Sequence, residues 1–124
     1  MTENEVIERV CRLASDFNGG SKSMVDLVAE SNVGGRIAKL TVSNLAPYFA
    51  QHPDLSYDWL RWSASKRVTS GWFFTRNGAD FVVGFFPKGD VLSFQDLAVA
   101  CAEFVLREVR DIAKRHRKIF GIHW

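Results

Sequence analysis

Residues 69–86 read TSGWFFTRNGADFVVGFF, two runs of aromatic and β-branched residues on either side of Asn77-Gly78. Such runs favour β-strands, and an Asn-Gly pair favours a two-residue type I′ turn because both of its residues accept a positive φ angle. The stretch therefore predicts an antiparallel β-hairpin. A turn centred on Asn77-Gly78 would place Phe74 opposite Phe81.

The side chains of this hairpin alternate between two faces. One face is almost wholly large and apolar, and we expect it to lie in the core; its members are Trp72, Phe74, Phe81, Val83 and Phe85. The reverse face carries Phe73, Val82 and Phe86 beside polar residues and the glycines Gly71 and Gly84. We expect the long C-terminal helix to cover this reverse face, with the glycines allowing a close approach. Left uncovered, it would be a hydrophobic patch for a partner protein or a second copy of the chain.

The first third of the chain has apolar residues at helical spacing. A capping-box pattern of Thr2 and Glu5 opens a helix that we expect to run to Gly19. Ser23 can cap a short second helix. This part of the chain is therefore predicted to be helical.

The middle of the chain is divided by two prolines. Arg36–Val42 alternates between apolar and polar residues, which suits a short strand, and its assignment stays open. Pro47 is expected in the first turn of a helix that starts near Asn44, because proline has no N–H to donate further along. Pro53 opens another, amphipathic helix, whose apolar stripe is Leu55, Trp59 and Trp62.

A long helix is predicted after the hairpin, over about Phe94–Arg117, with Ser93 as its N-cap. Val91-Leu92, just before it, suits a brief extended segment. The order of elements favours an α+β fold in which N-terminal helices and the hairpin, with or without a third short strand, pack with this helix. We expect residues 1–124 to form a single domain, because the chain is too short for two cores.

The charge and cysteine content indicate a soluble cytoplasmic protein. The chain of 124 residues has a net charge of +2, which by itself does not indicate a nucleic-acid binder. The acidic N-terminus resembles no signal peptide, and no apolar run is long enough to span a membrane. Cys11 and Cys101 each fall within a helical apolar pattern, so we expect two buried free thiols and a reducing compartment.

The motifs of common catalytic and cofactor sites are missing from this sequence. It contains no glycine-rich nucleotide loop, no nucleophile elbow and no Cys-x-x-Cys or His-Glu-x-x-His pair. The histidines His52, His116 and His123 have no carboxylate or thiol at ligand spacing. Asp54 and Asp58 are interpreted as a solvated face that Arg61 partly neutralises. We therefore expect no catalytic residues, no metal and no cofactor, although a small enzyme of unrecognised type stays an alternative.

Two functions remain. The first is a non-catalytic protein-binding module, for example an intracellular inhibitor of the immunity-protein type that neutralises a partner toxin or enzyme, or a homodimer. Its expected contact residues are Tyr57, Arg61, Lys66, Arg67, Phe73 and Phe86. The alternative is a nucleic-acid-binding accessory protein that uses the basic C-terminal helix. Its expected contact residues are Arg110, Lys114, Arg115, Arg117 and Lys118. The other interpretation of Arg110–Lys118 is a solvated helix end without a binding role. No membrane partner is expected.

Overall fold

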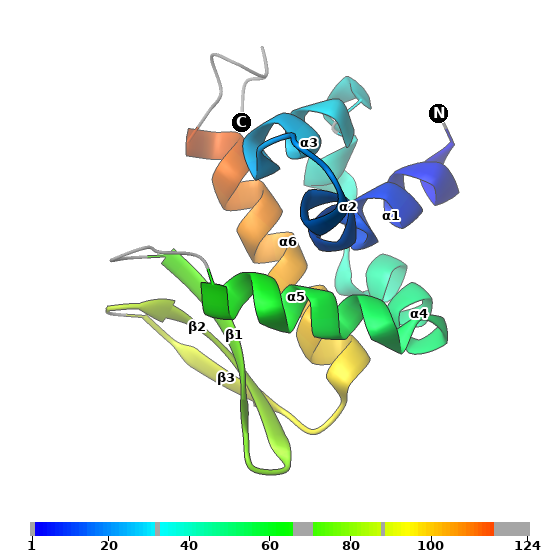
Figure 1. The fold of residues 1–124 in the computed structure, drawn as a ribbon. Coiled ribbons are helices and arrows are strands. Elements are labelled where there is room, and N and C mark those ends of the chain that lie inside the picture. Colours follow the sequence, from blue (N-terminus) through cyan, green and yellow to red (C-terminus); the bar gives the residue numbers. More distant parts are fainter. Residues whose placement is uncertain (1, 32, 66–70, 88, 116–124) are drawn as a thin grey trace.

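The computed structural model describes residues 2–31, 33–65, 71–87 and 89–115. These residues form helices and one three-stranded antiparallel sheet of order β1-β2-β3, which is an α+β fold as predicted. The elements are α1 (Glu3–Cys11), α2 (Leu13–Gly19), α3 (Met24–Ser31), the 3₁₀-helix η1 (Val33–Lys39), α4 (Val42–Gln51), α5 (Pro53–Ser65), β1 (Gly71–Asn77), β2 (Asp80–Phe86), β3 (Val91–Phe94) and α6 (Leu97–Arg115). Figure 1 shows the sheet at one side of the gathered helices.

The hairpin forms as predicted, but its turn lies one residue further along the chain. Asn77 pairs with Asp80, so the two turn residues are Gly78 and Ala79. Gly78 has a φ of 64°, and no other residue than glycine has a positive φ in the described part of the chain. A type II′ turn needs glycine only at its first central position. Asn77 therefore stays in the strand, and the expected type I′ turn at Asn77-Gly78 is wrong.

The shifted turn changes the partner of every strand residue but not its face. Phe74 lies opposite Val83, and the predicted pairing of Phe74 with Phe81 is wrong by two residues. Because this shift is even, each side chain keeps its side of the sheet. The predicted core face is confirmed at its centre: Phe74, Phe81 and Val83 are all buried.

Helix α6 packs on this core face. The ring of Phe74 stacks on that of Phe104 in α6, with centroids 5.5 Å apart, and the Arg107 guanidinium lies over the Trp72 ring at 4.7 Å. The expectation that the long helix covers the reverse face is therefore wrong. A helix contacts only one side of a sheet, and the larger apolar surface on the Phe74 side determines which side that is.

The third strand comes from residues 91–94, not from Arg36–Val42. β3 pairs antiparallel with β2, with Leu92 opposite Val83. Most of the Arg36–Val42 segment lies in η1 instead, and Thr41 then caps α4 in a reciprocal capping box with Asn44. Helix α4 thus starts at Val42, two residues before the predicted start.

Three further features of the helices differ from the predictions. The capping box of Thr2 and Glu5 is confirmed, but the first predicted helix is divided into α1 and α2 at Arg12. Pro47 lies inside α4 rather than in its first turn. The cap of α6 is Asp96, whose carboxylate accepts a hydrogen bond of 3.1 Å from the N–H of Val99, whereas Ser93 lies in β3.

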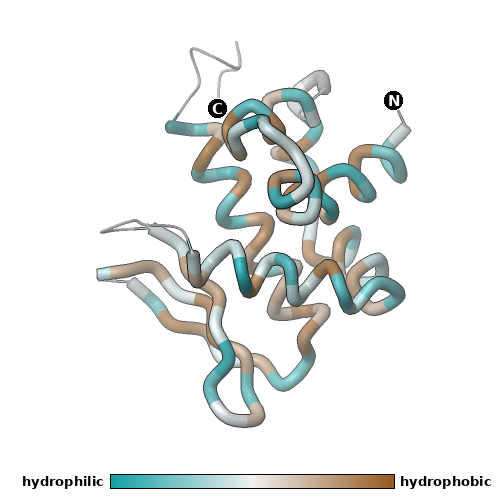
Figure 2. Tube along the Cα trace, viewed as in Figure 1, coloured by the Kyte–Doolittle hydropathy of each residue, from teal (hydrophilic) through white to brown (hydrophobic). Residues whose placement is uncertain are grey.

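The core joins the helices to the sheet through aromatic rings. Trp59 of α5 is fully buried and donates its indole N–H to the carbonyl oxygen of Cys11 at 2.9 Å. Its ring meets the edge of Phe104, 6.0 Å away between centroids, and Phe104 in turn stacks on Phe74. Hydrophobic residues accordingly recur along α6 and through the strands (Figure 2).

Candidate functional site

The face of the sheet opposite α6 carries an apolar cluster. Its members are Phe73, Val82, Phe86 and Val91, which we call the outer face. Phe86 is 56% exposed and Val91 is 61% exposed, while Phe73 and Val82 are half-buried. Among the described residues, no helix packs over Phe73 and Phe86, because α6 lies on the opposite face of the sheet.

Gly84 shapes this face by accepting the ring of Phe73. A Cβ atom at Gly84 would lie 2.7 Å from Cζ of Phe73 and 3.2 Å from a methyl carbon of Val91. The close approach that the sequence predicted at Gly84 is therefore made by a side chain of the adjacent strand, not by α6. It leaves Phe73 lying against the sheet, with Val91 beside it.

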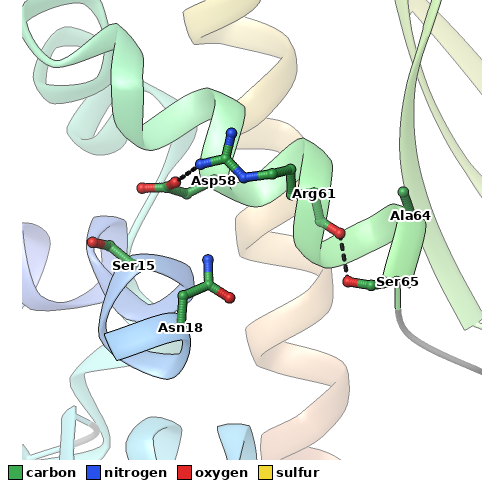
Figure 3. Close-up of a pocket in the computed structure, with 6 residues that line it drawn as sticks. All are labelled: Ser15, Asn18, Asp58, Arg61, Ala64 and Ser65. Atoms are coloured by element: carbon green, nitrogen blue, oxygen red, sulfur yellow. Dashed lines mark hydrogen bonds and ion pairs between the residues drawn. The ribbon is translucent and has the colours of Figure 1, made fainter. Parts of the chain in front are cut away.

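Tyr57 and Arg61 lie on a different surface, along α5. Tyr57 is 45% exposed, and Arg61 is exposed one turn later. Arg61 lines an open hollow of about 680 Å³ between α2 and α5 (Figure 3). Its other lining residues are Ser15, Asn18, Asp58, Ala64 and Ser65.

Three of the residues that line this hollow are joined by hydrogen bonds. Arg61 donates to the Asp58 carboxylate, and the Ser65 hydroxyl donates to the Arg61 carbonyl oxygen at 2.6 Å (Figure 3). The ion pair confirms that Arg61 partly neutralises the acidic face of α5. Two serines, an amide and a paired carboxylate form no acid–base arrangement. The hollow is suited at most to weak polar contact.

The expected partner-binding residues therefore form two groups. Phe73 and Phe86 share the outer face, whereas Tyr57 and Arg61 share α5. Lys66 and Arg67 lie outside the described residues.

The expected nucleic-acid-binding residues are also divided. Arg110 donates to the carbonyl oxygen of Leu40, and Arg115 pairs with Asp111 at 3.0 Å. Lys114 is exposed near the end of α6. The remaining two, Arg117 and Lys118, lie outside the described residues.

Three cations outside the predicted set line the two hollows that include Leu40. Arg107 lines one hollow with Arg110, and Arg36 and Lys39 line an adjoining hollow. The spacing of Arg107 and Arg110 was a visible signal, since residues three apart share a helix face. Nothing local in the sequence indicated that η1 packs beside α6.

Both cysteines are buried free thiols, as predicted. Burial raises the pKa of the Cys11 thiol to about 12, against a smaller opposing effect of the Arg12 charge. Burial also raises the pKa of Cys101 well above its ordinary value, and the Ser56 hydroxyl opposes this shift. A thiol that resists ionisation is a poor nucleophile, so neither cysteine forms a reactive site.

His52 packs on the ring of Tyr48, with centroids 4.4 Å apart, and His116 and His123 fall outside the described residues. Within the described ranges, no three potential metal ligands come together. None of the described helices combines the length and apolar character needed to cross a bilayer.

Comparison of the chain with protein-family models, with curated proteins and with solved structures finds no match.

Proposed function

We propose that this protein is a non-catalytic protein-binding module whose contact surface is the outer face of the sheet. The observation that carries the proposal is the exposure of Phe86 and Val91 beside the half-buried Phe73. Covering these side chains with a partner would remove apolar surface from water at about 25 cal/mol per Å². Aromatic residues at the centre of such a patch are typical anchors of protein interfaces.

The shape of the outer face supports the same proposal. Phe73 lies against Gly84, which keeps its ring close to the strands and limits the rotamer freedom that binding would cost. The exposed apolar side chains of a sheet face can pack against a helix or a sheet face of a partner.

An inhibitor that neutralises a toxin or enzyme is a narrower form of this proposal. It requires that the bound partner be an enzyme whose activity falls in the complex. A cytoplasmic location is also part of the proposal, because the buried thiols Cys11 and Cys101 remain reduced most readily there.

The experiment compares the wild-type chain with the double variant Phe86→Asp/Val91→Asp. Sedimentation velocity first establishes whether the wild type associates with itself. Each chain then captures proteins from a lysate of the native cells, and a candidate partner is purified and titrated by calorimetry. We expect the double variant to weaken partner binding by at least about a hundredfold, because two apolar anchors are replaced by charges.

The matched control is Asn4→Asp/Gln51→Asp, which adds the same charge at exposed positions on α1 and α4. It should bind the partner like the wild type. The proposal would be overturned if the wild type is a monomer and the Phe86→Asp/Val91→Asp variant captures the same proteins as the wild type. A wild-type dimer that this variant dissociates would identify a second copy of the chain as the partner.

A further inference from the structure

Two neighbouring hollows lie around Leu40, where η1, α4 and α6 meet. The first is lined by Arg107, Arg110 and Glu103 of α6 and by Thr41 at the start of α4, and its volume is about 380 Å³. The second, also about 380 Å³, includes Arg36 and Lys39 of η1 among its lining residues. Leu40 lines both. Cations from segments about seventy residues apart in the chain therefore line two hollows that meet at Leu40.

Arg107 and Arg110 of α6 are each held by a neighbouring group, and each keeps further N–H donors. Arg107 donates to the Glu103 carboxylate at 2.9 Å and lies over the Trp72 ring. Arg110 donates to the Leu40 carbonyl oxygen. A guanidinium carries five N–H donors, so each group retains hydrogen-bonding capacity for an anion.

The electrostatics of the surface favour an anionic ligand. Among the described residues, four cations line the two hollows against two carboxylates, Glu3 and Glu103. The first hollow also meets the N-terminal end of α4, at Thr41 and Val42, where the helix dipole adds positive potential. One of the carboxylates, Glu103, is already paired with Arg107.

The cations continue in a row beyond the hollows. Arg107, Arg110 and Lys114 follow one another at spacings of three and four, so they share one face of α6. A row of charges fits a polymer with repeated anionic groups better than a single small anion. Planar guanidinium groups match the paired oxygens of a phosphate.

We propose that this basic face, made of Arg36, Lys39, Arg107, Arg110 and Lys114, binds the phosphate backbone of a nucleic acid. This face shares Arg110 and Lys114 with the set that the sequence indicated, and it adds Arg36 and Lys39 of η1 and Arg107 of α6. The contact is made to phosphates and is therefore independent of base sequence.

The test measures fluorescence anisotropy with a labelled single-stranded oligonucleotide of about twenty nucleotides and with its duplex, between about 50 and 200 mM salt. We expect binding whose logarithm falls linearly with the logarithm of salt concentration. In Arg107→Gln/Arg110→Gln, affinity for the single strand should fall roughly tenfold or more, and the salt slope should become shallower by about 1.4.

Circular dichroism checks whether the first variant folds. A second variant, Lys39→Gln/Lys114→Gln, removes two exposed charges and tests the same face if the first variant does not fold. It should lower the affinity similarly. The matched control, Lys22→Gln/Arg76→Gln, removes the same charge from exposed positions outside both hollows and should bind like the wild type.

Three outcomes would overturn the proposal. The first is a wild type that does not bind either oligonucleotide at about 50 mM salt, where phosphate contacts are strongest. The second is an equal loss of affinity in the control and in the basic-face variants. The third is displacement of the oligonucleotide by polyglutamate at equal charge concentration, which would indicate an acidic protein as the ligand.

Discussion

Cys11 lies where a thiolate cannot be hydrated. Its side chain is fully buried beside α5, and its own carbonyl oxygen accepts the indole N–H of Trp59. The apolar surroundings that exclude water also raise the pKa of the thiol from an ordinary 9.0 to about 12. The helical apolar pattern around Cys11 predicted this burial, because it depends on which face of α1 turns inward.

The raised pKa makes the stability of the fold depend on alkaline pH. Between pH 9 and about 12 the unfolded chain loses the Cys11 proton while the folded chain keeps it, so the free energy of unfolding falls as pH rises. Below pH 9 this contribution is fully present. In this pH window the free energy of unfolding should fall less steeply for Cys11→Ala than for the wild type. The two slopes should differ by up to about 1.4 kcal/mol per pH unit.

Urea unfolding at a series of pH values up to about 11 measures this difference. The control is Val10→Ala, a buried neighbour that does not titrate. It should lower stability at every pH but keep the wild-type slope. Parallel curves for Cys11→Ala and the wild type would show that the thiol does not resist ionisation in the folded chain.

The start of helix α6 is determined by the sheet. Ser93 is part of β3, so the helix is capped by Asp96 and begins after it. Ser93 is opposite Val82 in β3, so its backbone pairs with a strand. Asp96 is the next residue with a capping side chain, and it bonds to the N–H of Val99. Both side chains can cap a helix, but Ser93 is held in β3, so Asp96 caps α6.

The two caps can be distinguished by substitution. Asp96→Ala should lower the free energy of unfolding by about 1 kcal/mol, because a helix-terminal N–H loses its partner and the helix dipole loses a favourable charge. Ser93→Ala, at an exposed strand position, should change it by less than about 0.5 kcal/mol. Urea denaturation of both variants checks the assignment, and a larger loss for Ser93→Ala would contradict it.

The whole molecule is joined by one hydrophobic cluster. It includes Val6 of α1, Trp59 of α5, Phe74 of β1 and Phe104 of α6. Since Phe104 contacts both Trp59 and Phe74, the helices and the sheet bury their apolar surface against each other. Neither part retains a complete core without the other.

We therefore expect the chain to unfold in a single cooperative transition. Far-UV circular dichroism and tryptophan fluorescence should give coincident urea curves, and the calorimetric enthalpy should equal the van't Hoff enthalpy. Phe104→Leu, at the helix–sheet contact, should shift both curves equally. Two separate transitions would show that the helices and the sheet fold as independent units.

Much of the architecture could be predicted because its signals are local. Alternation along residues 71–86 placed Phe74 and Phe73 on opposite faces, and it did so despite a two-residue error in register. Helical spacing likewise identified the inward face of α5. The predicted turn position was wrong, since both Asn77 and Gly78 can start a tight turn and the strand pairing determines which one does.

The sequence by itself thus determined an α+β fold, the hairpin, its two faces and the burial of both cysteines, all of which follow from residue periodicity. Only the tertiary structure decided that α6 covers the Phe74 face and leaves Phe86 exposed, and that Arg110 of α6 meets Leu40 at the end of η1. The physical reason is that periodicity describes which way a side chain points relative to its own strand or helix. Which distant element comes to meet it depends on how all apolar surfaces are buried together.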